Sequence, residues 1–243
     1  MKLIYSLILL LCSTLVLAEV THLKFTADSS PSVFVISNEI YKEINKELKK
    51  EGLQISVVKR PLLRGVQEVN YAELDGDVGR SKTKALLDEF PNLRPLDESI
   101  IKIKYLTISK AKKLDTSKKL KYGVLRGVIG AKDIMTKFEK VYLRTEKQKY
   151  EMLKNNRIDF FMVKKFNDRA FYNKEYADKN KFILGKRPYI ELDVVPILNH
   201  KSIIHKDKLT RAVKRAKKSG AIDKAIERAY QMLIRPQEKS KFN

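Results

Sequence analysis

The sequence predicts an α/β protein made of two lobes that are joined by two extended crossings. Three observations predict this architecture. Strand-like runs alternate with amphipathic helices twice along the chain, two extended runs are longer than an average strand, and no low-complexity linker or internal repeat interrupts the series. We expect residues 19–104 and 192–243 to form lobe 1 and residues 105–191 to form lobe 2. A single continuous sheet would argue against this division.

The N-terminus is typical of a secretory signal peptide over residues 1–18. Lys2 supplies the positive start, a short apolar core follows, and a small-residue cleavage site ends at Ala18. The core is shorter than the ~20 residues of a membrane span, although a retained anchor is the alternative. We expect a soluble mature protein that starts near Glu19 in the periplasm or outside the cell. Because Cys12 is the only cysteine, the mature protein would have no disulfide and no cysteine metal site.

The chain is strongly basic, with 51 Lys and Arg against 29 Asp and Glu and a formal charge of +22. Such an excess attracts polyanions such as nucleic acid, anionic lipid or lipopolysaccharide. The basic residues are scattered among acids rather than gathered in one tract, which favours a solvated lysine-rich surface. We therefore expect no nucleic acid partner.

The first elements form a βαβ unit. Residues 22–26 alternate as a strand does, and Ile36, Ile40, Ile44 and Leu48 recur at helical spacing before Gly52. Residues 54–59 alternate again, so a parallel sheet with a right-handed crossover is expected.

The remaining elements continue the alternation. Helices are expected at 61–69, 81–90, from Asp133, at 145–155, and from Lys206 to about Leu233 with a break at Ser219-Gly220. Strands are expected at 120–125, 141–143, 158–163 and 182–184. The long extended runs 100–109 and 189–198 would cross between the lobes, with hinges near 99–105 and 186–192.

The segment 71–80 holds two candidates for ligand contact, Asp75 and Arg80, of which Arg80 is the main one. Its Asp75-Gly76 pair is a strong turn signal, and Gly79 is expected to help form the turn. Arg80 would then lie near a strand end, where open α/β sheets place their ligand crevice. A guanidinium can hold a carboxylate or phosphate with two parallel hydrogen bonds. The alternative for Arg80 is a surface ion pair with Asp75 or Asp77.

Two further loops hold candidate ligand contacts. Asp28, Ser29 and Ser30 follow the first strand at its carboxyl end, where their alternative role is to cap the next helix. Arg126 and Gly127 precede an expected helix start whose free N–H groups suit an anion, and the alternative is a structural turn. No metal-ligand spacing or nucleophile elbow is found, so we expect no metal, no cofactor and no enzyme.

The order of several motifs resembles a known family, the type 2 periplasmic solute-binding proteins, and among them the extracellular family 3 group that serves amino-acid ABC transporters. The matching pieces are residues 27–31, 73–80, 122–127, 153–159 and 217–222. The resemblance implies a two-lobed Venus-flytrap with two hinge crossings that closes on a small molecule. Family members use an arginine for the ligand carboxylate and an acidic residue for its amine. Lys164 falls at or near that acidic position, and Ala72 and Asn156 stand where the family commonly has Gly.

From these features we expect a monomeric solute-binding protein for a small polar, anionic ligand. It would serve an ABC transporter permease or a membrane sensor. If Arg80 and Lys164 face one cleft from opposite lobes, they are two unpaired cations whose repulsion an anion would relieve. The alternatives are a basic envelope protein that binds a polyanion and a periplasmic lyase that uses the same cleft.

Overall fold

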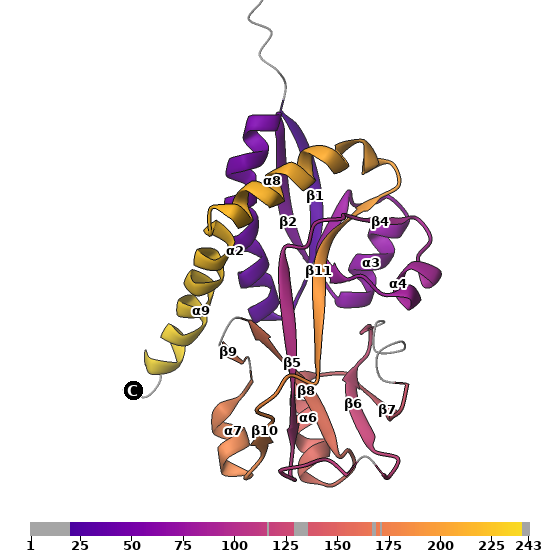
Figure 1. Cartoon of the computed structure of the whole chain (residues 1–243), viewed down its shortest axis with the longest axis vertical. Coiled ribbons are helices and arrows are strands. Elements are labelled where there is room, and N and C mark those ends of the chain that lie inside the picture. The colour runs from indigo at the N-terminus through magenta and orange to yellow at the C-terminus, as the bar shows by residue number, and fades with distance from the viewer. Residues whose placement is uncertain (1–19, 116, 129–135, 167–168, 171, 240–243) are drawn as a thin grey trace, which may run out of the picture.

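The computed structural model describes residues 20–115, 117–128, 136–166, 169–170 and 172–239, which form a mixed α/β molecule with two lobes (Figure 1). The predicted signal peptide, residues 1–18, and the predicted helix start at Asp133 lie outside the described residues. Within the described part of the chain, no helix has both the length and the apolar character that a bilayer crossing requires.

The secondary-structure elements alternate as the sequence predicts. The strands are β1 (Thr21–Asp28), β2 (Leu53–Arg60), β3 (Gly76–Ser81), β4 (Leu93–Pro95), β5 (Ile101–Ser109), β6 (Lys121–Leu125), β7 (Glu139–Leu143), β8 (Phe160–Phe166), β9 (Arg169–Ala170), β10 (Ile183–Leu184) and β11 (Ile190–Asn199). The α-helices are α2 (Pro31–Leu48), α3 (Leu62–Asn70), α4 (Lys84–Glu89), α6 (Glu146–Lys154), α7 (Lys174–Lys179), α8 (Lys206–Lys218) and α9 (Ala221–Lys239). Two short 3-10 helices cover Lys49–Glu51 and Ser202–His205.

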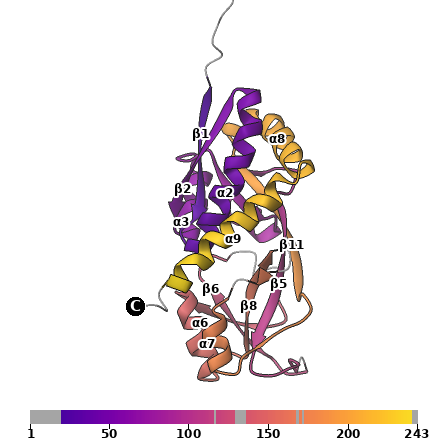
Figure 2. The same ribbon diagram turned by 90° about the vertical axis from the view of Figure 1, so that its left-hand side faces the viewer.

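Lobe 1 is a sheet covered by helices on both faces. Strands β2, β1 and β3 run parallel, as the predicted βαβ unit requires. On one face α2, α8 and α9 bury the main apolar core, which includes Phe25, Ile44 and Leu209. On the other face α3 and α4 bury a smaller core around Val66 and Leu86. The C-terminal helices thus return to lobe 1 and complete it (Figure 2).

Strands β5 and β11 connect the lobes. They pair with each other from Ile101 opposite Val194 to Tyr105 opposite Ile190. Strand β11 also pairs with β3 of lobe 1, and β5 also pairs with β8 of lobe 2. The hydrogen bonding therefore forms one sheet, in the order β2-β1-β3-β11-β5-β8-β6-β7. The expectation of separate sheets is wrong, because the two crossing strands hydrogen-bond to each other and to both lobes. The two lobes remain distinct in their strands, helices and cores (Figure 1).

Lobe 2 is built around β8, β6 and β7. Helices α6 and α7 pack on one face, over a core that includes Phe161, Leu153 and Phe182. Helix α6 begins at Thr145, which forms a capping box with Gln148, and such a box satisfies two free backbone donors at a helix start. The short helix α7 was not predicted from the sequence.

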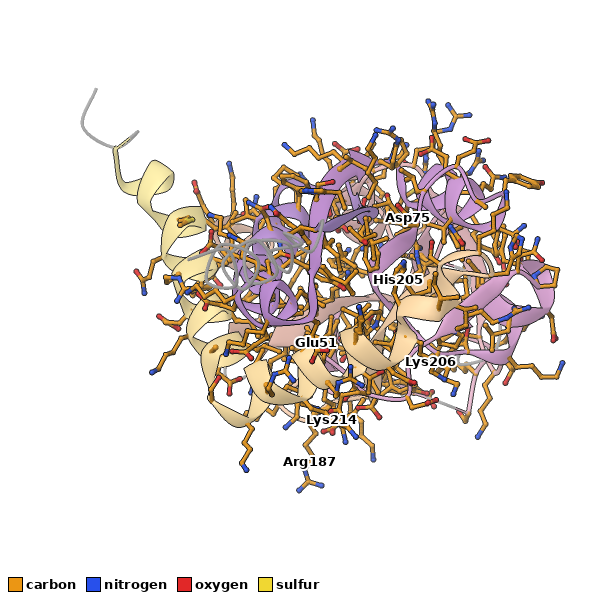
Figure 3. The ribbon with its side chains drawn as sticks, turned by 90° about the horizontal axis from the view of Figure 1, so that it is seen from above. Glu51, Asp75, Arg187, His205, Lys206 and Lys214 are labelled. Carbon is orange, nitrogen blue, oxygen red and sulfur yellow. The ribbon has the colours of Figure 1, made fainter. Side chains whose placement is uncertain are left out.

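Helix α2 is tied to the C-terminal helices by a ladder of glutamates. Glu39, Glu43, Glu47 and Glu51, here called the glutamate ladder, recur every four residues and so share one face of the helix and its 3-10 extension. Three arginines of the C-terminal helices donate to them: Arg211, Arg215 and Arg228. Figure 3 shows Glu51 beside α8, seen from the lobe 1 end.

The two glycines of the segment 71–80 are strand residues, which corrects the predicted turn. A Cβ on Gly76 would lie 2.4 Å from the Ile197 carbonyl oxygen, and one on Gly79 would lie 2.6 Å from Val194. These glycines therefore allow β3 to approach β11 closely. Because β3 continues to Ser81, the following helix begins at Lys84 rather than at residue 81.

The two positions at which the family commonly has Gly do adopt a glycine-like backbone. Ala72 has φ 59° and Asn156 has φ 54°, in the left-handed region that L side chains rarely occupy. Each follows a helix, α3 or α6, so the residue reverses the chain where a C-terminal glycine usually would.

Candidate ligand-binding cleft

Parallel strands bring two of the predicted residues to the same edge of the lobe 1 sheet. Thr26 of β1 lies opposite Asp77 of β3, so Asp28 and Arg80, a few residues further on, both lie at the carboxyl ends of their strands. This edge faces lobe 2 (Figure 1). Open α/β sheets bind ligands at the same edge.

Arg80 is held by a buried carboxylate. Its Nε donates to Asp77 Oδ2 at 2.6 Å, and its Nη2 donates to the Leu62 carbonyl oxygen at 2.8 Å. The side chains are only 11% and 3% exposed, so the ion pair that was the alternative for Arg80 exists but is not a surface pair. Burial raises the pKa of Asp77, against the opposing effects of the Arg80 guanidinium and the Gly79 amide. The expectation that Arg80 is an unpaired cation is wrong, although its Nη1 makes no hydrogen bond to a described residue.

Lys164 approaches the same region from lobe 2. It lies on β8, directly opposite Tyr105 of β5, and is half-buried. It makes no hydrogen bond or ion pair to any residue that the structure describes. Burial lowers the pKa of its ammonium, the carboxylates of Asp28 and Glu146 raise it, and the Arg80 guanidinium lowers it. Charged groups of both lobes therefore act on Lys164.

A second lysine of lobe 2, Lys149, interacts electrostatically with Lys164 and Asp28. Lys149 of α6 is buried and donates to Glu146 Oε1 at 2.9 Å, and its Nζ lies 6.0 Å from the centre of the Phe161 ring. Burial lowers the pKa of Lys149, and Glu146 raises it. Lys164 lowers this pKa and Asp28 raises it, both by smaller amounts. The sequence does not predict this pair, because a Glu and a Lys three residues apart on a helix usually mark its solvent face.

Two tyrosines lie beside these charges. Burial raises the pKa of Tyr105 to about 12, against the effect of a hydrogen bond with the Ser81 side chain. Burial also raises the pKa of Tyr122, and the neighbouring Tyr105 and Glu146 raise it further. Both phenols therefore stay protonated and can donate a hydrogen bond to an acidic group.

The lobes touch at a glycine. Gly127, in the loop after β6, has φ 87°, and a Cβ built on it would lie 3.3 Å from the Leu63 amide nitrogen. Leu62, whose carbonyl accepts from Arg80, is also within van der Waals contact of that position. Arg126, its neighbour, is exposed, and its amide donates to the Leu143 carbonyl oxygen.

The remaining predicted residues have local partners. Ser30 donates from its amide and its Oγ to the Asp28 carboxylate, at 3.2 and 3.0 Å, and Ser29 is exposed. Asp75 lies at the amino end of β3, where its carboxylate accepts from the Lys24 amide and from Ser202 Oγ, both at 2.8 Å. The structure thus separates Asp75 from Arg80 and places it at the far end of lobe 1, near His205 (Figure 3).

Comparison with known proteins relates the fold to solved structures. No family model matches the sequence, and no curated protein matches it. The amino acid ABC transporter substrate-binding protein AbpA from Streptococcus pneumoniae, bound to L-arginine, superposes with a TM-score of 0.64 at 17% identity, covering 86% of this chain and 94% of that one. The GluR0 ligand-binding core in complex with L-glutamate gives 0.65 at 13% identity, covering 86% and 97%.

The chain has the type 2 periplasmic-binding-protein fold. A third structure of this fold is the ancestral amino acid-binding protein AncCDT-1, a precursor of cyclohexadienyl dehydratase, with a TM-score of 0.61 at 14% identity over 85% of this chain and 94% of that one. At these identities the likeness shows the fold alone.

Among the residues that the structure describes, no group of three His, Cys, Asp or Glu side chains could hold a metal ion. A separate hollow of about 500 Å³ lies between the crossing strands and the C-terminal helices. Its lining includes Lys104 and Glu191 of the strands and Lys217 and Ile226 of the helices. Asp28, Arg80 and Lys164 do not line this hollow.

Proposed function

We propose that this protein is exported and captures a small acidic solute between its two lobes, for delivery to a membrane transporter or sensor. The observation that carries the proposal is Lys164, a half-buried ammonium of lobe 2 without a partner among the described residues, which feels the charges of Asp28 and Arg80 from lobe 1. A ligand group that contacts Lys164 and lobe 1 together would hold the two lobes closed.

The charges of the cleft favour a ligand that carries an acidic group. A carboxylate or phosphate can accept from Lys164 and from the Nη1 group of Arg80. Tyr105 and Tyr122 supply further donors. A basic ligand side chain would instead meet Lys164 and Lys149 on lobe 2 and be repelled.

Asp28 adds a requirement of opposite sign. Its carboxylate lies on lobe 1 close enough to Lys164 and Asp77 to change their pKa values, and it accepts only from Ser30 within the described residues. An ammonium group of the ligand can bind there. An acidic amino acid carries both a carboxylate for Lys164 and Arg80 and an ammonium group for Asp28. A dicarboxylate would bind only to Lys164 and Arg80.

A thermal-shift screen tests the proposal. A ligand at 100 times its dissociation constant adds roughly 2.7 kcal/mol, which for a chain of this size raises Tm by roughly 5–10 °C. Acidic amino acids, dicarboxylates and phosphates should give this shift, and arginine and lysine should not. Lys164→Met should remove most of the shift, whereas Lys102→Met, at an exposed position of β5, should retain it. A larger shift with arginine or lysine would overturn the proposal.

A lyase that uses the same cleft is the second candidate, because one similar structure is a precursor of cyclohexadienyl dehydratase. The two functions differ in their products. Mass spectrometry of each stabilising compound after incubation should recover it unchanged if the protein only binds it, and a dehydrated product would favour the lyase.

A further inference from the structure

The positive charge of the molecule is unevenly compensated. In lobe 1 three arginines, Arg211, Arg215 and Arg228, pair with the glutamate ladder. Lys42, Lys46 and Lys50 pair with the same glutamates. The end of lobe 2 that lies furthest from lobe 1 has no such ladder in the part that the structure describes (Figure 1).

Three segments meet at this end. They are the loop between β5 and β6, the turn after α6 and the turn after α7. Lys110 of the loop donates from Nζ to the Lys154 carbonyl oxygen and to Asn156 Oδ1, both at 2.7 Å, which joins the loop to the α6 turn. Ile183 pairs with Ser109 across β10 and β5, which brings the α7 turn beside the same loop. We call the exposed charged residues of these segments, together with those at the ends of the elements that flank them, the distal surface.

The distal surface holds ten basic side chains against three aspartates. The basic residues are Lys110, Lys112, Lys113, Lys118, Lys119, Lys121, Lys154, Arg157, Lys179 and Lys181, and all are exposed. Asp115 pairs with Lys118 at 3.8 Å, Asp178 pairs with Lys174, and Asp159 accepts from the Lys121 amide. Lys112, Lys113 and Lys119 form no ion pair with any described residue.

We propose that the distal surface binds the surface of an anionic lipid bilayer. Its charges come from three loops at one end of an elongated molecule, so a flat surface can contact them together (Figures 1 and 2). Exposed lysines attract anionic headgroups without fixed geometry, and each strengthens membrane binding by about fivefold near the surface.

The side chains of the distal surface favour a membrane over a nucleic acid. All but one of the basic residues are lysines, which act as point charges rather than as the planar forks that read bases and phosphates. The loop between β5 and β6 has no aromatic residue on which bases could stack.

The proposal is independent of the ligand in the cleft. Contact through the distal surface leaves Lys164 and the paired part of β5 and β11 uncovered, because these lie toward the lobe 1 end of β5. The other end of β5, at Ser109, leads into the distal surface. A molecule held in this way stays near the membrane while its lobes remain able to close.

Vesicle sedimentation of the full chain tests the proposal. The protein should bind vesicles with about one third phosphatidylglycerol more tightly than pure phosphatidylcholine vesicles, and raising the salt from about 0.05 to about 0.3 M should release it. The triple change Lys112→Glu, Lys113→Glu and Lys119→Glu should weaken this binding by more than about 100-fold.

The matched control is the triple change Lys201→Glu, Lys214→Glu and Lys224→Glu, at exposed positions of lobe 1. It alters the net charge equally and should weaken binding by less than about fivefold. Equal losses in the two triple variants, or no preference for the anionic vesicles, would overturn the proposal. Tighter binding to single-stranded DNA than to the vesicles, lost in the distal variant, would also overturn it and assign the surface to nucleic acid.

Discussion

Arg80 donates from Nε to the carboxylate of Asp77, 2.6 Å away, and neither side chain is more than 11% exposed. The arginine that would hold a ligand is therefore also the counter-ion of a buried acid. Binding and stability are coupled at this residue, and the test of its role has to separate them.

Arg80→Ala should lower the free energy of unfolding by about 3 kcal/mol, because it leaves Asp77 buried without its partner. Asp77→Asn in the same chain should recover part of that loss, since it removes the uncompensated charge. Urea unfolding of the two single variants and the double variant measures the coupling between them.

If the losses of the two single variants simply add, the pair contributes nothing beyond its separate side chains and the interpretation is wrong. Ligand binding is then best compared in Arg80→Lys, which keeps the charge but loses the paired N–H groups.

The glutamate ladder should make lobe 1 sensitive to acid. Hydrogen bonds from Lys50 and Arg215 lower the pKa of Glu47, and those from Arg211 and Arg215 lower the pKa of Glu51 to about 2. In Glu39 burial acts in the opposite direction, but the lysine and arginine partners outweigh it. Acids with lowered pKa values stabilise the fold above the unfolded value of 4.5, and this contribution is lost as the pH falls through the lowered values. The urea midpoint should therefore fall steeply between about pH 5 and pH 2.

Glu47→Gln isolates this effect. At neutral pH it should lower the free energy of unfolding by up to about 1 kcal/mol. At a pH below the lowered pKa of Glu47 it should have no effect, because the wild-type residue is then protonated too. Glu73→Gln, at an exposed turn position, is the matched control and should leave the midpoint unchanged at both pH values. An equal effect of Glu47→Gln at both pH values would contradict the ladder's role.

Part of this site could be predicted from the sequence. The first predicted strand locates Asp28 at a carboxyl strand end, and the turn signal of Asp75-Gly76 indicates that Arg80 lies near another. The family resemblance points to Lys164. Lys149 could not be predicted, because only its packing beside Phe161 shows that it points inward. Strand β3 was also missed, since its glycines have low β propensity and are explained by the close approach of Val194 and Ile197.

Gly127 should control how closely the lobes approach each other. With φ 87° and the Leu63 amide nitrogen 3.3 Å from its Cβ position, Gly127→Ala would strain the backbone and press against lobe 1. Gly52→Ala is a matched control, because Gly52 has φ 71° but no atom within 4 Å of its Cβ position. Both changes should cost about 1–2 kcal/mol of stability from the backbone alone. Only Gly127→Ala should also increase the radius of gyration in small-angle X-ray scattering and weaken ligand binding, because it alone separates the lobes. An unchanged radius in Gly127→Ala would show that this contact does not limit closure.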